Sequence, residues 1–185
     1  KEVKQHIDAV FVNPVAIPDF QGIDTKYKKT QYSSYDINKP ICEYNVPNRI
    51  CLEEYFYNYK DSKLTWEKTS FSERKNIFLK AADLLENKYY HKMLAYTIVS
   101  QNKNIYEAEL DSICELVDFL RLNVYYAEEI LNKQPVQSQN IQNISEYNSL
   151  NGFVASITPF NVTAIGGNIA SAPLLFGNSV LWKPS

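Results

Sequence analysis

Gly152-Phe-Val-Ala-Ser-Ile-Thr-Pro-Phe-Asn161, followed further along the chain by Ser179-Val-Leu-Trp-Lys183, decides the fold of this chain. Each segment begins with an apolar run of strand length, so we expect buried strands over 152–158 and 179–183. The residues between them are compatible with a helix over 162–176, which Gly177 ends as a left-handed cap. Strand, helix and parallel strand form the βαβ unit of a doubly wound, nucleotide-binding sheet, so the fold class is α/β.

A helical layer precedes this unit. Ser70-Phe-Ser-Glu73 fits a capping box, which predicts a helix start, and apolar residues then recur at helical spacing up to Leu85. Two more helices are predicted, over 91–99 and over 105–131. The first 65 residues predict short strands at 9–12, 30–35 and 40–44, and a helix over 49–66.

The chain divides into four parts on these patterns. Residues 1–65 hold the first strands and a helix, and 66–134 form the helical layer. Residues 135–150 are polar, and are either a linker loop or an exposed two-stranded excursion used for oligomer contacts. Residues 151–185 open the nucleotide-binding domain, which is incomplete here.

Composition excludes several classes of function. The 185 residues carry 19 basic and 21 acidic side chains in a well-mixed order, so no basic stripe indicates nucleic acid or an anionic membrane as partner. No apolar run approaches the roughly 20 residues that a membrane span needs. Cys42, Cys51 and Cys114 form no CxxC pair and only two histidines are present, so we expect reduced thiols and no metal site.

The stretch 147–182 has no charged side chain and holds four of the five glycines, which directs attention to this end of the chain. Asn161 follows the first strand, where its amide could hold an oxyanion or simply cap the helix start. Lys183 ends the second strand, and either binds a ribose or phosphate or only frames the strand. Gly166-Gly167 is either a phosphate-binding turn or a site of close helix packing.

An acidic stripe runs along the third predicted helix, through Glu107, Asp111, Glu115 and Asp118. Like charges at this spacing destabilise an isolated helix by roughly 0.2 to 0.5 kcal/mol per pair. The stripe is either a solvated face, or one member, Glu115 at mid-helix, faces an amine or a basic partner.

These strings together resemble the aldehyde dehydrogenase superfamily over about residues 66–185. The resemblance is carried by Gly152-Phe-Val-Ala-Ser-Ile-Thr-Pro-Phe-Asn161, Ala172-Pro-Leu-Leu-Phe-Gly-Asn178, Trp182-Lys-Pro-Ser185, Gln101-Asn-Lys-Asn104 and Glu115-Leu-Val-Asp-Phe-Leu-Arg121. Thr163-Ala-Ile-Gly-Gly-Asn168 is similar specifically to the L-glutamate γ-semialdehyde (Δ1-pyrroline-5-carboxylate) dehydrogenases.

The resemblance implies NAD-dependent oxidation of glutamate γ-semialdehyde to glutamate in proline catabolism. It implies that Asn161 is the oxyanion donor, that Lys183 binds the adenosine ribose, and that Glu115 lies near the substrate's amino group. It places a set of residues along the dinucleotide groove: Ile157, Thr158, Pro159, Phe160, Pro184 and Ser185. Val162 would line the aldehyde tunnel, where the family often has a larger aromatic residue.

The resemblance also implies a homo-oligomer with a small-molecule substrate, in the mitochondrial matrix, or in the cytoplasm if the protein is bacterial. The nucleophilic cysteine and the general base are expected beyond Ser185, so we expect an amino-terminal fragment that is inactive alone. Two alternatives stay open at this point. One is an aldehyde dehydrogenase of other substrate preference, and the other is a non-catalytic protein that binds a nucleotide or a partner.

Overall fold

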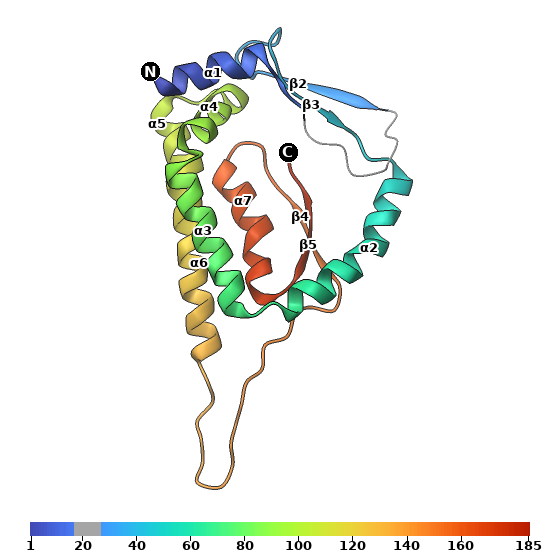
Figure 1. The fold of residues 1–185 in the computed structure, drawn as a ribbon, viewed down its shortest axis with the longest axis vertical. Helices are drawn as coiled ribbons and strands as arrows, with labels where there is room; N and C mark the ends of the chain where they lie inside the picture. Colours follow the sequence, from blue (N-terminus) through green and yellow to red (C-terminus); the bar gives the residue numbers. More distant parts are fainter. Residues whose placement is uncertain (17–26) are drawn as a thin grey trace.

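The computed structural model describes residues 1–16 and 27–185. The part from residue 71 onward is layered (Figure 1). Helices α3 (Phe71–Asn87) and α6 (Glu115–Asn132) lie side by side, and α7 (Thr163–Ser171) packs against α6. The paired strands β4 (Phe153–Ile157) and β5 (Ser179–Lys183) form the next layer, in which β5 contacts α7. Helix α2 (Arg49–Lys68) contacts β5 and closes the ring of elements on the other side.

The βαβ prediction is confirmed. Strands β4 and β5 pair in parallel, with Phe153 opposite Ser179 and Ile157 opposite Lys183. The connection is α7 followed by a short 3₁₀ helix, η2 (Ala172–Phe176), which has its proline in the first turn. Gly177 ends η2 with a φ of +78°, the left-handed conformation that the sequence predicted.

One predicted strand is wrong. Residues 9–12 lie in helix α1 (Glu2–Val12), whose Ile7, Val10 and Phe11 pack in a small core with Ile41 and Val99. Those three side chains are spaced as on one face of a helix, and a run of four apolar residues taken alone does not distinguish the two structures. The other elements of this region match: β2 (Lys28–Tyr32) and β3 (Pro40–Asn45) pair antiparallel, with β1 (Val15–Ala16) on the far edge of β3.

The helical layer follows the sequence patterns, with one difference. The capping box forms: Glu73 N donates to Ser70 Oγ at 3.2 Å, and Ser70 N donates to the Glu73 carboxylate at 2.9 Å. After α4 (Tyr90–Gln101), the helix predicted over 105–131 is divided into α5 (Ile105–Ala108), a π-helical segment η1 (Glu109–Cys114) and α6. The π-helix arises from backbone hydrogen bonding, which apolar spacing does not report.

The helical layer and the βαβ unit are joined by packing and by buried hydrogen bonds. Side chains of α3, α6, α7 and η2 form one core, in which Gly167 lies over Leu116. At the other end, the buried Arg74 donates from Nε to the Leu175 carbonyl at 2.9 Å, and Trp66 Nε1 donates to the Leu174 carbonyl at 2.9 Å. The crossover from α7 to β5 is therefore fixed to the junction of α2 and α3.

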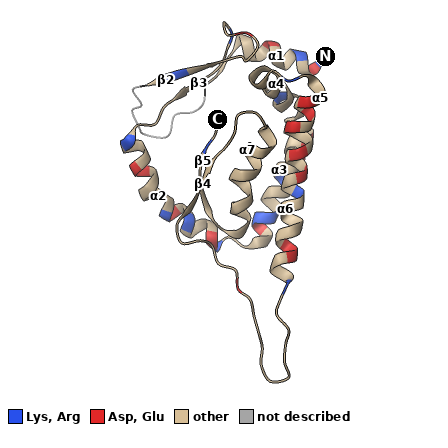
Figure 2. Cartoon of the chain, turned by 180° about the vertical axis from the view of Figure 1, so that it is seen from behind, with Lys and Arg blue, Asp and Glu red and all other residues tan. Residues whose placement is uncertain are grey.

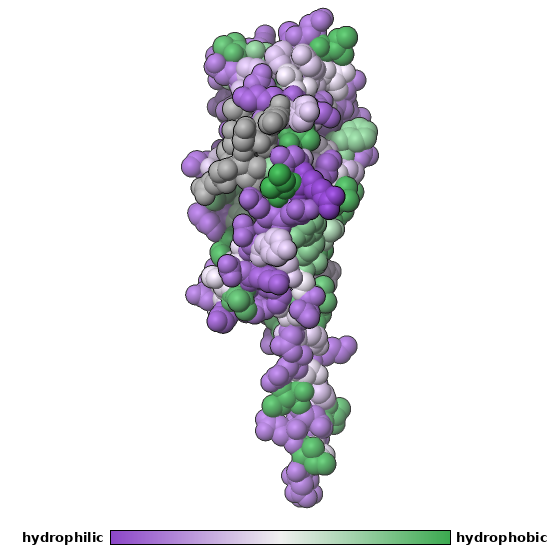
Figure 3. Space-filling view, turned by 90° about the vertical axis from the view of Figure 1, so that its right-hand side faces the viewer, coloured by the Kyte–Doolittle hydropathy of each residue, from purple (hydrophilic) through white to green (hydrophobic). Residues whose placement is uncertain are grey.

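The segment between α6 and β4 projects from the body of the protein (Figures 1 and 3). It holds a single isolated bridge, between Ser138 and Ile141, and its use in oligomer contacts stays a prediction. Several of its apolar side chains are exposed, namely Val136, Ile141, Ile144, Tyr147 and Leu150. Across the part of the chain that the structure describes, every helix is too short or too polar to span a bilayer.

Candidate active site

The carboxyl ends of β4 and β5 form one edge, and the two residues singled out from the sequence lie at it. Ile157 pairs with Lys183, and Thr158 N donates to the Lys183 carbonyl at 3.3 Å. The chain leaves β4 here and reaches Asn161 before α7 begins. Ligands of open parallel sheets bind outside this edge, so the register places Asn161 and Lys183 at the same edge as a candidate site.

The residues that the sequence predicts for the dinucleotide groove are exposed along this edge, with one exception. Ile157, Pro159, Phe160, Lys183, Pro184 and Ser185 are exposed. Thr158 is buried, and its hydroxyl accepts a hydrogen bond from Trp182 Nε1 at 3.1 Å. That hydroxyl therefore ties the two strand ends together.

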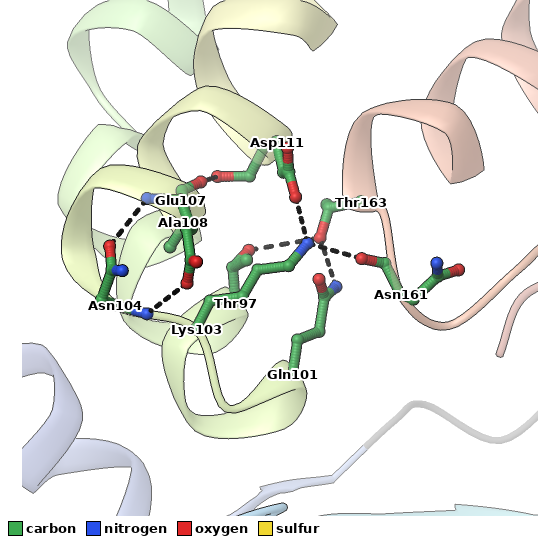
Figure 4. Close-up of polar contacts among 10 residues, drawn as sticks. Thr97, Gln101, Lys103, Asn104, Glu107, Ala108, Asp111, Asn161 and Thr163 are labelled. Carbon is green, nitrogen blue, oxygen red and sulfur yellow. Dashed lines mark hydrogen bonds and ion pairs between the residues drawn. The ribbon is translucent and has the colours of Figure 1, made fainter.

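The side chain of Asn161 is not a helix cap. The N-cap of α7 is Val162, which makes no side-chain capping bond. Among residues 1–16 and 27–185, the carboxamide of exposed Asn161 takes part in no hydrogen bond, and it points away from Lys103 and Gln101 (Figure 4). An amide with unused N–H groups at a ligand-binding edge is suited to stabilising negative charge on a substrate oxygen.

The backbone around Asn161 is held by side chains from the helical layer (Figure 4). Lys103 Nζ donates to the Asn161 carbonyl at 2.5 Å and forms an ion pair with Asp111. Gln101 Nε2 donates to Thr163 Oγ1 at 2.7 Å, and the buried Gln101 Oε1 has no partner in the described residues. The turn between β4 and α7 is thus held at Asn161 itself and at Thr163, two residues further on.

Sequence reasoning did not identify this contribution of Lys103. The residue lies far from Asn161 in the chain, and its distance of eight residues from Asp111 matches no helical pairing. Asn102 brings them together: it is the C-cap of α4 with a φ of +54°, a left-handed conformation that Asn tolerates better than most residues. Asn just after a helix can signal such a left-handed end, but the signal is weaker than that of a glycine.

The acidic stripe has no single role. Glu107 closes a capping box with Asn104, and Asp111 pairs with Lys103. Glu115 is half-buried at the start of α6, and its carboxylate has no ion pair or hydrogen bond within the described part of the chain. Leu116, the next residue, packs beneath Gly167 of α7, so Glu115 lies close to the layer that carries Asn161.

The other titratable groups offer no nucleophile or metal site here. Burial raises the pKa of the Cys42 thiol. Burial, together with the negative charge of Glu109, likewise raises the pKa of Cys114, so both thiols stay protonated near neutral pH. The described residues contain no group of histidines, cysteines and carboxylates that could hold a metal ion. In Figure 2 the charged residues lie mainly on the other helices, whereas α7 and β4 carry no charged side chain.

A parallel sheet edge that presents an amide after the first strand and a lysine at the end of the second defines a candidate ligand site of an α/β protein. The chain belongs to the aldehyde dehydrogenase family, whose model matches residues 28–185. The resemblance read from the sequence is therefore confirmed at the level of the family.

The relatives specify the class further. The chain is 42% identical over 176 residues to the probable delta-1-pyrroline-5-carboxylate dehydrogenase of Schizosaccharomyces pombe, a match that covers 93% of this chain and 32% of that protein. It is 37% identical over 185 residues to the mitochondrial delta-1-pyrroline-5-carboxylate dehydrogenase of Homo sapiens, covering all of this chain and 32% of that one.

A solved structure agrees with both. The delta-pyrroline-5-carboxylate dehydrogenase of Mycobacterium tuberculosis bound with NAD superimposes with a TM-score of 0.94 at 33% identity, over 99% of this chain and 35% of that chain. The fold is that of the amino-terminal part of an aldehyde dehydrogenase. The chain spans about a third of the length of each of these relatives.

Proposed function

We propose that this chain is the amino-terminal part of an NAD-dependent dehydrogenase that oxidises L-glutamate γ-semialdehyde to L-glutamate in proline catabolism. One observation supports the chemistry above others: the carboxamide of Asn161 projects unbonded from the carboxyl edge of a parallel strand. The printed names of the relatives support the substrate. The nucleophilic cysteine and the general base belong to the part of the enzyme outside this chain, so we expect this part to be inactive alone.

Asn161 stabilises the charge that develops on the aldehyde oxygen when a thiolate adds to the carbonyl carbon. Its N–H groups break no existing hydrogen bond to the described residues when they bind the oxyanion, and Lys103 holds the backbone carbonyl of the same residue. Removing one such donor from an oxyanion site costs about 3 kcal/mol of activation free energy, or roughly a hundredfold or more in rate.

Lys183 and its neighbours fit a dinucleotide. The ammonium group of Lys183 is exposed at the edge, and it forms no ion pair with the acidic residues of the described chain, so it is available to ribose hydroxyls. The exposed side chains of Ile157 and Phe160 supply apolar surface beside it. NAD bound here supplies the hydride acceptor for the reaction.

Two further residues act on the aldehyde. The unpaired carboxylate of Glu115 faces the substrate's ammonium group, and its position close to α7 supports this role. Val162, partly buried at the start of α7, lines the aldehyde tunnel, which its small side chain widens. The assignment of Glu115 distinguishes a substrate that carries an amino group from a simple aldehyde.

The assembly proposed is a homo-oligomer with contacts through the projecting segment, and the supporting observation is its exposed apolar side chains (Figure 3). For the compartment we propose the mitochondrial matrix, because several relatives are named as mitochondrial proteins. The cytoplasm is the corresponding compartment if the protein is bacterial.

The experiment compares Asn161→Ala with Lys183→Ala in the full-length enzyme. Asn161→Ala is expected to lower kcat with glutamate γ-semialdehyde by roughly 10²-fold, with the Kd for NAD changed less than about twofold. Lys183→Ala is expected to weaken NAD binding mainly. Titration of NAD by fluorescence and steady-state rates give both quantities. An Asn161→Ala enzyme with a normal kcat contradicts the proposal.

A further inference from the structure

Lys103 connects the helical layer to the residue proposed to hold the oxyanion. Its Nζ contacts two oxygens: the carboxylate of Asp111 on η1 and the backbone carbonyl of Asn161. Both side chains are largely buried, with 16% of Lys103 and 25% of Asp111 exposed. A charge in such a position makes stronger hydrogen bonds than one in open solvent.

Lys103 itself is held on both sides. Asn102 turns the chain sharply before it, in a left-handed conformation. Asn104 begins α5 after it, accepting hydrogen bonds from Tyr106 N and Glu107 N at 3.0 Å. The ammonium group is therefore presented to Asn161 from a rigid part of the backbone.

The carbonyl that Lys103 holds belongs to the same residue as the free carboxamide. Holding this carbonyl restrains the peptide plane between Asn161 and Val162 and so anchors the Asn161 Cα. The directions open to the Cα–Cβ bond, and with it to the carboxamide, are thereby restricted. An oxyanion donor is effective when it is preorganised, that is, oriented before the charge develops, and this requires a fixed backbone.

We propose that Lys103 is a positioning residue for the Asn161 carboxamide and that Asp111 holds Lys103 in place for this task. The inference rests on the proposed function, because it assigns Lys103 a role that is expressed only in the oxidation step. Lys103 touches neither the substrate nor the cofactor. Its removal therefore lowers kcat through Asn161 and leaves the binding of NAD unchanged.

The test is a double-mutant cycle in the full-length enzyme. Lys103→Met removes the charge and keeps the stem, and it is expected to lower kcat about tenfold, with the Kd for NAD changed less than twofold. In an Asn161→Ala background the same substitution is expected to cost less than threefold, because the amide that Lys103 positions is already absent. Lys103→Arg keeps a donor and is expected to recover part of the rate.

A matched control separates this role from the loss of an ion pair. Lys75 pairs with Glu128 at 2.8 Å between α3 and α6, with side chains 30% and 46% exposed, and neither residue belongs to the candidate site. Lys75→Met is expected to leave kcat within twofold of the wild type. Asp111→Asn, a neutral isostere that retains Lys103, serves as the second variant if Lys103→Met does not fold, and is expected to lower kcat with the same non-additivity toward Asn161→Ala.

The outcomes are distinct. If Asn161→Ala loses rate as expected but Lys103→Met is normal, or costs the same factor in both backgrounds, the role of Lys103 is wrong and the proposed function stands. An equal loss of kcat in Lys75→Met also overturns it. If Asn161→Ala itself has a normal kcat, the proposed function fails, and the role of Lys103 fails with it.

Discussion

Replacing Gly167 by alanine tests how closely α7 must approach α6. A Cβ at position 167 would lie 2.7 Å from Leu116 Cδ1 and 3.1 Å from Cδ2, well inside van der Waals contact. Leu116 is buried in the main core, so its side chain cannot simply turn away. The neighbouring Gly166 provides the comparison, because a Cβ there would meet nothing nearer than Thr158 Oγ1 at 3.7 Å, an ordinary contact.

The expected magnitudes follow from two opposing effects. Alanine is more favourable than glycine inside a helix by about 1 kcal/mol. Forcing an extra methyl into a packed core costs typically about 1–3 kcal/mol. Gly166→Ala receives only the first effect and is expected to stabilise the protein by about 1 kcal/mol. Gly167→Ala receives both, and a net loss of about 1 kcal/mol is expected.

The assay is urea-induced unfolding of the full-length protein, followed by circular dichroism. A third variant supplies the control: with Leu116→Ala in place, the clash partner is gone, and Gly167→Ala is expected to change from destabilising to stabilising relative to Leu116→Ala alone. Shifts of the same sign and size for the two glycine variants would refute the reasoning. So would a cost of Gly167→Ala that persists unchanged beside alanine 116.

Two further predictions concern Tyr90 and Glu115. The Tyr90 hydroxyl donates to Glu109, and this bond, together with burial, raises the pKa of Tyr90 from 10.0 to about 12. The folded state thus favours the protonated phenol, so this stabilisation is complete below pH 10 and is lost as the pH rises through about 12. The difference in unfolding free energy between wild type and Tyr90→Phe should be constant from pH 7 to 9 and smaller at pH 11. An unchanged difference at pH 11 would contradict the role of the Tyr90–Glu109 hydrogen bond. In the full-length enzyme, Glu115→Gln should raise the KM for glutamate γ-semialdehyde about tenfold or more. The KM for an analogue without the amino group should not change. Equal effects on both aldehydes would exclude a contact between Glu115 and the ammonium group.

The parts of the fold that the sequence predicted are those with local causes. The capping box at Ser70 and the left-handed Gly177 depend on residues within a few positions of each other, and both are present. The two strands around α7 were recognisable because each is a short apolar run bounded by loop residues. Gly167 was read as either a phosphate turn or a close-packing site, and its contact with Leu116 supports close packing.

The errors have a common origin in contacts beyond the local pattern. Residues 9–12 are helical because Val10 joins Ile41 and Val99 in a core assembled from three separate elements. The π-helical segment η1 depends on which backbone carbonyl each N–H selects, and neighbouring α4 and α7 pack against it. A run of four apolar residues is too short to report a helix, and side-chain periodicity does not report which carbonyl an N–H selects.

In the candidate site, too, some residues could be placed from the sequence and others could not. Asn161 and Lys183 could be placed at one edge from the sequence, because parallel strands bring their carboxyl ends together. Lys103 could not, since its approach to Asn161 requires the turn at Asn102. The chemistry proposed for the edge therefore depends on the helical layer for its precision: the sheet supplies the reacting amide, and a lysine from the helices fixes the backbone that aims it. A dehydrogenase that kept the sheet but repacked the helices would retain Asn161 and lose its alignment.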